Sequence, residues 1–421
     1  MSQAPSTPDA SASAPNLRIS TIEFVAIVAW LMALNALAID VMLPALGDIS
    51  TDFALTNPND RQLVVVAYVL GFGVPQLVWG PLSDRYGRRP VLFAALIGYT
   101  LMGFLAAWVG SFEQLIGVRL FQGMFAAGAR VVAVAVVRDV YSGRNMARIM
   151  SWIMTVFMAV PITAPMIGQA VLFIAPWRGL FVLLGIAGLV MLVWAGLRLD
   201  KTRPGDASVS LSARMPRQGY AALLRSRVAL GYTAAAGVVF GALFAFIASA
   251  EQVFKEVFET GDSFVLWFGL IATALAAVNI VNARLVQRFG MRRLSHGALV
   301  GFCGLSLVLA ALLATFDASL TLFIPFFALI FGLFGLIGAN FNALAMEPFG
   351  RSAGTASAAY GFATTTASGL LGGLVGRAYD GTAVPLVVGF AALGIASLVI
   401  VVITERGRLF NEGEEASPPQ R

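Results

Sequence analysis

Four polar residues inside long apolar stretches are the main candidates for chemistry, and the first is Asp40. It lies near the end of an apolar stretch that runs from residue 22 to residue 44. An ionisable side chain inside a membrane span costs free energy and is by default a functional candidate. Loss of water favours the neutral form of a carboxylate, so Asp40 could exchange protons near neutral pH. The alternative is that Asp40 is an interfacial acid that caps its helix among the lipid headgroups.

The other three candidates, Arg119, Gln122 and Arg130, share the apolar stretch 114–137. Eleven residues make three helical turns plus about 20°, so Arg119 and Arg130 project from one face, and Gln122 lies one turn from Arg119 on that side. Because a guanidinium facing lipid is prohibitive, we expect this face to line a cavity or to meet an acid. For Arg119 the alternative is a residue near the end of a span that reaches the headgroups.

The elements that position these residues are apolar helices. The chain has 421 residues, of which 58% are hydrophobic and 12% are charged, whereas a soluble domain has about 25% charged residues. We therefore predict an integral membrane protein. About 20 apolar residues cross a bilayer, and twelve stretches qualify: 22–44, 62–82, 91–110, 114–137, 149–172, 179–198, 228–250, 263–284, 294–314, 319–345, 353–376 and 383–404.

The placement of positive charge predicts the orientation of these spans. With both ends of the chain in the cytoplasm, 22 of the 28 Lys and Arg residues fall on the cytoplasmic side, and only Arg61, Arg178, Lys255 and Arg377 fall outside. This asymmetry is typical of a multi-pass membrane protein. It also accounts for the net charge of +6 without a nucleic-acid partner.

Other chemistries find no support in the sequence. A single His296 and a single Cys303 offer neither a His-rich metal site nor a disulfide framework. No set of a nucleophile and a base is apparent, so we expect no enzyme, no metal and no cofactor. A proton gradient would be the source of energy.

A charged turn separates the second span from the third, and it carries a family resemblance. It reads Gly80-Pro81-Leu82-Ser83-Asp84-Arg85-Tyr86-Gly87-Arg88-Arg89-Pro90. The pattern resembles the signature loop of the major facilitator superfamily. The resemblance implies that Asp84, Arg85 and Arg88, within the same turn as Arg89, form a charge relay that locks two halves of a transporter on the cytoplasmic side. Gly80 and Gly87 would allow close approach and a sharp reversal of the chain. The alternative is a simple positively charged loop.

The sequence also indicates a repeat of six spans. The polar stretch 199–227 separates six spans from six, and Arg288-Phe289-Gly290-Met291-Arg292-Arg293 repeats the turn after the eighth span. Because Gln287 stands where Asp84 stands in the first copy, we expect the second copy to keep the turn but to lose the acidic half of the relay. The predicted organisation is a disordered tail (1–20), an N-terminal half (21–198), a linker (199–227), a C-terminal half (228–404) and a second tail (405–421).

Several further residues have predicted structural roles. Pro161 and Pro165 should bend the fifth span, and small residues such as Gly168, Gly372 and Gly376 suit close helix packing. Glu347 is expected to cap the cytoplasmic end of the tenth span. Glu251 and Gln252 end the seventh span and are expected to be rim residues rather than part of a site.

Four other segments narrow the resemblance to one branch of the family. They are Ala38–Leu46, Arg119–Gly123, Arg138–Tyr141 and Ala353–Ser357, and they resemble the Bcr/CflA drug-resistance branch, whose members are proton-coupled multidrug exporters. The resemblance implies a monomer of twelve helices in a bacterial inner membrane. It implies export of small organic molecules in exchange for protons, with Asp40 and Arg119 in proton coupling and substrate binding.

Two rival functions remain open at this point. One is a metabolite symporter or facilitator on the same fold, because residues 160–169 keep only Pro165 and Gly168 of the usual antiporter signature. The other is a membrane sensor that transports nothing.

Overall fold

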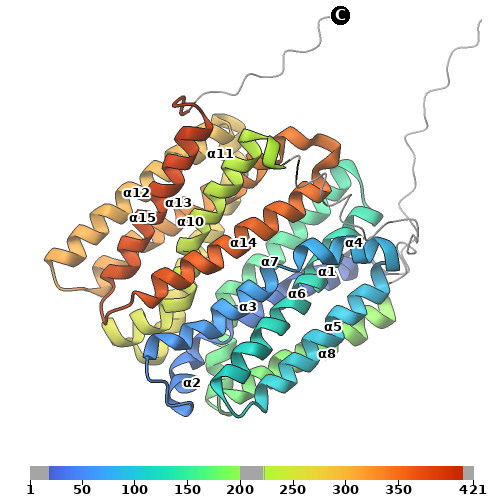
Figure 1. Ribbon diagram of the computed structural model, residues 1–421, viewed down its shortest axis with the longest axis horizontal. Helices are drawn as coiled ribbons and strands as arrows, with labels where there is room; N and C mark the ends of the chain where they lie inside the picture. Colours follow the sequence, from blue (N-terminus) through green and yellow to red (C-terminus); the bar gives the residue numbers. More distant parts are fainter. Residues whose placement is uncertain (1–18, 200–220, 222, 411–421) are drawn as a thin grey trace, which may run out of the picture.

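The computed structural model describes residues 19–199, 221 and 223–410, and these residues form helices without a β-strand among them. Figure 1 shows the helices running side by side in one bundle. We call α1 to α8 the N-terminal half and α10 to α15 the C-terminal half. The predicted tails and linker lie largely outside the described residues.

The N-terminal half contains six spans built from eight α-helices. They are α1 Thr21–Asp40, α2 Leu46–Asp52, α3 Leu63–Gly73, α4 Gln76–Tyr86, α5 Arg88–Ala107, α6 Phe112–Val140, α7 Gly143–Leu172 and α8 Arg178–Arg198. Two short 3-10 helices, η1 Leu43–Ala45 and η2 Pro58–Gln62, lie on either side of α2.

The C-terminal half repeats the plan with α10 Arg227–Gln252, α11 Phe264–Phe289, α12 Met291–Thr315, α13 Leu320–Met346, α14 Ala353–Arg377 and α15 Val384–Thr404. A π-helix, η3 Val253–Val257, extends α10, and the 3-10 helices η4 Gly261–Ser263 and η5 Glu347–Ser352 precede α11 and α14.

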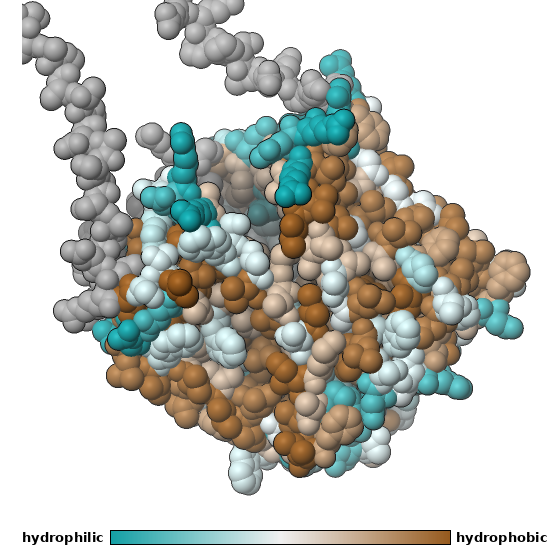
Figure 2. Space-filling view, turned by 180° about the vertical axis from the view of Figure 1, so that it is seen from behind, coloured by the Kyte–Doolittle hydropathy of each residue, from teal (hydrophilic) through white to brown (hydrophobic). Residues whose placement is uncertain are grey.

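Length and apolarity support ten or eleven of the twelve predicted spans in the described chain. Ten described helices could cross a membrane, and the bent pair α3–α4 makes an eleventh. The remaining predicted span, 353–376, coincides with α14, which has 25 residues but is not among these apolar helices because it is rich in Gly, Ala and Thr. Figure 2 shows apolar side chains over much of one face of the bundle, with hydrophilic side chains gathered along its upper edge and again toward its lower right. The all-helical membrane fold is thereby confirmed.

Serine residues begin several of these helices. The side chains of Ser20, Ser111, Ser226 and Ser319 accept a hydrogen bond from the backbone N–H three residues further on. Such a cap satisfies one of the four N–H groups that a helix start leaves without a partner.

Two predicted spans are interrupted where proline follows. The stretch 62–82 forms α3 and α4, which meet at Val74 and Pro75 with a bend of 44°, because proline cannot donate the helical hydrogen bond. The first span stops at Asp40, and η1 with Pro44 intervenes before α2. Asp40 is therefore the last residue of a helix rather than an interior one. Pro161 and Pro165, in contrast, lie within the single helix α7, so the bending assigned to them stays a prediction.

Glycines allow the helices to touch backbone to backbone. A Cβ on Gly123 of α6 would lie 2.1 Å from the Tyr68 carbonyl oxygen of α3, and a Cβ on Gly168 of α7 would lie 2.2 Å from the Val41 carbonyl oxygen. A Cβ on Gly372 of α14 would lie 2.7 Å from the Phe244 Cβ of α10. Real Cβ atoms do not approach so closely, so these positions require glycine, in agreement with the packing role predicted for Gly168 and Gly372.

The repeat is visible in the backbone of the two turns. Gly87, between α4 and α5, has φ 92° and ψ 155°, and Gly290, between α11 and α12, has φ 77° and ψ 157°. Both conformations are ones that other residues rarely adopt. Each half therefore reverses its chain at the same place in the same way.

Candidate functional site

Arg119 is the centre of a buried polar group in the N-terminal half. Its side chain is fully buried, and its guanidinium donates to the carbonyl oxygen of Ala38 at 2.9 Å, to that of Val64 at 3.1 Å and to Oε1 of Gln122 at 2.8 Å. The Tyr68 ring lies 4.4 Å from the guanidinium carbon. Since Ala38 belongs to the last turn of α1, whose carbonyls lack helical partners, the cation stabilises that helix end.

This geometry differs from the expectation that Arg119 meets an acid, whereas a cavity along its helix face stays a prediction. The guanidinium contacts carbonyls, an amide and aromatic rings instead, because the break in α1 frees a carbonyl oxygen within its reach. None of the hydrogen bonds that Arg119 makes in the described chain goes to Asp40, the other residue expected to take part in proton coupling. Among the described residues, Asp40 has no recorded ion pair or hydrogen bond, although its residue is only 4% exposed.

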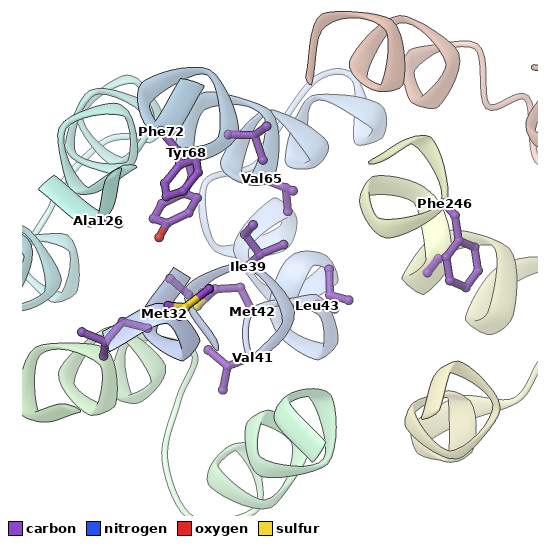
Figure 3. Packing of buried hydrophobic residues seen from close by; sticks show 14 of the residues in the cluster. Met32, Ile39, Val41, Met42, Leu43, Val65, Tyr68, Phe72, Ala126 and Phe246 are labelled. Atoms are coloured by element: carbon purple, nitrogen blue, oxygen red, sulfur yellow. The ribbon is translucent and has the colours of Figure 1, made fainter. Parts of the chain in front are cut away.

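Several buried polar atoms of the N-terminal half lack a partner among the described residues, two of them on side chains that contact Arg119. The Tyr68 hydroxyl, the Gln122 Nε2 and the Asn35 Oδ1 are buried and make no hydrogen bond in the part of the chain that is described. In Figure 3 the Tyr68 hydroxyl points from α3 toward the segment that carries Met32 and Met42. An unpaired buried polar atom costs free energy, so such atoms mark a place where water, a proton or a ligand could bind.

Arg130 lies apart from this group, at the other end of the shared helix face. It is half-buried, and its guanidinium carbon lies 5.6 Å from the centre of the Phe72 ring, with no acid among its recorded partners in the described chain. That Arg119 and Arg130 line one binding surface along α6 therefore stays a hypothesis.

The charged turn forms a relay, but with different partners from those expected. Arg88 lies 2.6 Å from Asp84 and 2.9 Å from Asp139 at the end of α6, and it also donates to Ser83. Arg85 instead lies against the Tyr86 ring, and Arg89 donates to the Gly196 carbonyl oxygen of α8. Asp139 was missed as a relay residue, although it closes a recognised segment of the sequence.

Gly80 does not have the close contact expected of it. A Cβ there would meet nothing within 4 Å, because no helix of the described chain covers this face of α4 in the present conformation. Gly87 serves the reversal of the chain, as its positive φ shows.

The second turn retains an ion-pair relay, which corrects the expectation that it loses its acid. Arg292 lies 2.8 Å from Glu347 at the end of α13 and 3.1 Å from Glu405 after α15. Acids from neighbouring helix ends therefore pair with this turn, although Gln287 stands where the first turn has Asp84. Glu347 is an ion-pair partner between helices and not only a helix cap.

Comparison with known proteins decides the family. The family model described as the Major Facilitator Superfamily matches residues 28–373. This chain belongs to the Major Facilitator Superfamily. A bicyclomycin resistance protein homologue of Haemophilus influenzae is 26% identical over 387 residues, covering 91% of this chain and 96% of that protein. The multidrug resistance protein MdtL of Escherichia coli is 25% identical over 394 residues, covering 91% and 96%.

Other relatives and solved structures agree with this assignment. A chloramphenicol resistance protein of Pseudomonas aeruginosa is 34% identical, over 154 residues that cover 36% of each chain. The Escherichia coli xylose transporter XylE has a TM-score of 0.70 at 13% identity, covering 90% of this chain and 97% of that one. The human organic anion transporter MFSD10 has a TM-score of 0.68 at 18% identity, covering 91% and 100%. The family match and the full-length relatives identify this chain as a membrane transporter and not an enzyme.

A polar cluster joins the two halves of the transporter at the end of the bundle opposite to the charged turns. We call Asn59, Asp60, Arg61, Gln62, Glu251, Gln252, Glu256, Arg377 and Tyr379 the inter-half cluster. Gln62 donates to Gln252 at 2.5 Å and to the Gly376 carbonyl oxygen at 3.0 Å, and Arg61 contacts both Glu251 and Glu256. Glu251 and Gln252 are therefore buried between the halves, not rim residues as expected.

The two ends of the transporter therefore differ in whether their ion pairs connect the two halves. The ion pairs of the described turns, Arg88 with Asp84 and Asp139 and Arg292 with Glu347 and Glu405, each stay within one half. The ion pairs of the inter-half cluster cross from one half to the other. The described contacts therefore hold the halves together at the cluster end.

For Asp84→Asn we expect slower transport with unchanged equilibrium affinity for substrate. The amide keeps the shape but loses one of the two acids that hold Arg88, and Asp84 lies in a partly exposed turn away from Arg119. The measurement is a comparison of transport rate with substrate binding by the purified protein. Asp317→Asn, an exposed acid at the opposite end, is the control. A large loss of affinity at an unchanged rate would contradict the relay role.

Proposed function

We propose that this protein exports small organic molecules across the cytoplasmic membrane in exchange for protons, by alternating access of a central site. The observation that carries the proposal is Asp40, a buried carboxylate without a recorded ion pair at the point where α1 breaks. Transporters commonly bind ions and substrates where a membrane helix is broken. A buried acid free of a fixed counter-ion can alternate between its charged and neutral forms.

The names of the relatives support export of drugs rather than uptake of nutrients. They include a bicyclomycin resistance protein homologue, a multidrug resistance protein and, over part of the chain, a chloramphenicol resistance protein. We infer that the cargo of this chain belongs to the same broad class of small antibiotics.

The balance of charge in the N-terminal half indicates which charge the transported molecules should carry. Arg119 and Arg130 supply two positive charges, and Asp40 supplies one negative charge that protonation removes. Such a field disfavours a dication and suits neutral, zwitterionic or anionic molecules. The unpaired Tyr68 hydroxyl and Gln122 Nε2 would add hydrogen bonds to a carbonyl or hydroxyl group of the cargo.

The proposed orientation follows from the distribution of Lys and Arg. With the turns that contain Gly87 and Gly290 in the cytoplasm, the inter-half cluster lies outside, both termini lie inside, and the structure represents a state held shut at its outer end. We expect a monomer in the inner membrane.

A resistance profile tests the proposal at the level of the cell. Cells that overproduce the protein should tolerate several chemically varied antibiotics, neutral ones above all, and should lose this tolerance when a protonophore collapses the proton gradient. Accumulation of a metabolite together with protons would instead identify a symporter. Unchanged tolerance and no transport of any tested compound would favour a sensor.

For Arg130→Ala we expect a change in substrate preference that exceeds any loss of stability. A guanidinium offers five donors in a planar fork, so its loss should weaken transport of anionic or acceptor-rich compounds and spare cationic ones. The measurement is a transport panel of anionic, neutral and cationic compounds together with a melting curve. Arg138→Ala, an exposed residue of the same helix, is the control. Early melting with equal loss of all substrates would show that Arg130 is structural.

A further inference from the structure

Glu251 has an unusual place within the inter-half cluster. It belongs to the last turn of α10 and is only 3% exposed, with Arg61 Nη1 3.3 Å from its Oε2 and Lys255 Nζ 3.6 Å from its Oε1. Its Oε2 is buried and makes no hydrogen bond within the described chain. A carboxylate in this position depends on two nearby cations, not on directed hydrogen bonds, to remain charged.

Those two cations also contribute to the contacts between the halves. Arg61 comes from η2 of the N-terminal half, and Lys255, although it belongs to η3 of the C-terminal half, donates to the Pro44 carbonyl oxygen of η1 at 3.2 Å. The charge on Glu251 therefore holds Arg61 across the interface and positions Lys255 against the partner half.

The other acids around Glu251 have hydrogen-bond or ion-pair partners of their own. From η3, Glu256 contacts the same Arg61 and accepts from the Tyr379 hydroxyl at 3.0 Å. From η2, Asp60 pairs with Arg377 at 3.0 Å. From α2, it is Gly47 that approaches Glu251, since a Cβ there would lie 2.9 Å from Oε1. This leaves Glu251 as the one fully buried acid among these groups.

We propose that Glu251 is a second proton-binding site, and that its protonation from the outer side releases the inter-half cluster and opens the outer end of the transporter. The proton moves from external water to the Glu251 carboxylate and forms a neutral acid, which removes the negative charge that pairs with Arg61. Arg61 then keeps only its ion pair with Glu256, whose half-exposed side chain lets water weaken the attraction. This inference rests on the orientation in the proposed function, and it assigns to Glu251 a gating role that is separate from the role of Asp40.

The experiment measures the opening of the outer end as a function of pH, without any substrate. In a Cys303→Ser protein, which has no other cysteine, spin labels are placed at Thr56→Cys and Ala318→Cys, two exposed positions at the cluster end of opposite halves. Double electron–electron resonance in nanodiscs then gives the ratio of long to short distances. From about pH 8 to about pH 5, we expect this ratio to rise about tenfold as the carboxyl group becomes protonated.

Glu251→Gln should imitate the protonated acid. We expect the long distance to dominate at every pH, and the pH response to fall to less than about a third of its original size. Glu256→Gln is the matched control, because it contacts the same Arg61 but is half-exposed, and it should keep the response. If Glu251→Gln cannot be purified folded, Arg61→Gln serves in its place, and because it removes the same ion pair between the halves, it should make the long distance dominate at every pH.

The outcomes distinguish this proposal from the proposed function. The role of Glu251 is overturned if the distance ratio of Glu251→Gln still changes fully with pH. It is also overturned if only Glu256→Gln loses this change. Since the labels report distance and not transport, a protein that opens as expected but exports no antibiotic would overturn only the proposed function.

Discussion

Asp40→Asn is expected to abolish proton-coupled export while leaving a folded protein in the membrane. The asparagine cannot exchange a proton, so the cycle loses the step that links the proton gradient to movement of the cargo. Because Asp40 has no recorded ion pair in the described chain to lose, we expect the free energy of unfolding to change by less than about 1 kcal/mol. The predicted signature is therefore complete loss of function at nearly normal stability.

The measurement combines drug efflux from energised cells with a melting curve of the purified protein. Asp48→Asn removes an exposed acid from the adjacent helix α2 and should behave like the unmodified protein. Normal efflux by well-expressed Asp40→Asn would show that the proton is carried elsewhere. A strongly lowered melting temperature would show instead that Asp40 has a structural role.

Gly123→Val is expected to prevent correct packing of the N-terminal half. The new Cβ would lie 2.1 Å from the Tyr68 carbonyl oxygen and 2.9 Å from the Phe72 backbone nitrogen. Both atoms belong to α3 and cannot rotate away, so α6 and α3 would have to separate and the contacts of Arg119 with the Val64 carbonyl would be lost. We expect a loss of more than about 3 kcal/mol of stability, the upper range for overpacked cores.

The same helix offers a matched control for this change. Gly117→Val adds the same side chain to α6 where nothing lies within 4 Å, so it should cost little. The amount of folded protein extracted in mild detergent and its melting temperature compare the two variants. Equal stability of both would contradict the close contact between α3 and α6.

The sequence was sufficient to predict the helices, the turns and the buried polar residues, because each depends on local composition. Apolar length marks the spans, Gly87 and Gly290 mark sharp reversals, and Asp40 and Arg119 stand out as ionisable residues in apolar surroundings. Family resemblance then supplied the fold, which the family match supports.

The partners of these residues could not be predicted, because they depend on chain segments that are distant in sequence. Gln62 and Gln252 are 190 residues apart, and only the packing of the halves brings them to 2.5 Å. Arg119 binds a carbonyl that becomes available because α1 breaks at Asp40, and a break before Pro44 is hard to locate within a uniformly apolar stretch. In the same way, Glu347 and Glu405 replace a missing acid from helices other than the one that carries the turn.

The central claim is exchange of protons for an organic cargo through Asp40, and proton flux in proteoliposomes tests it most directly. With the protein reconstituted and a pH-sensitive dye inside, addition of a transported antibiotic to one side should drive protons out of the compartment that the antibiotic enters. Asp40→Asn proteoliposomes should show no such flux. Protons that move in the same direction as the antibiotic, or a flux that persists in Asp40→Asn, would contradict the account.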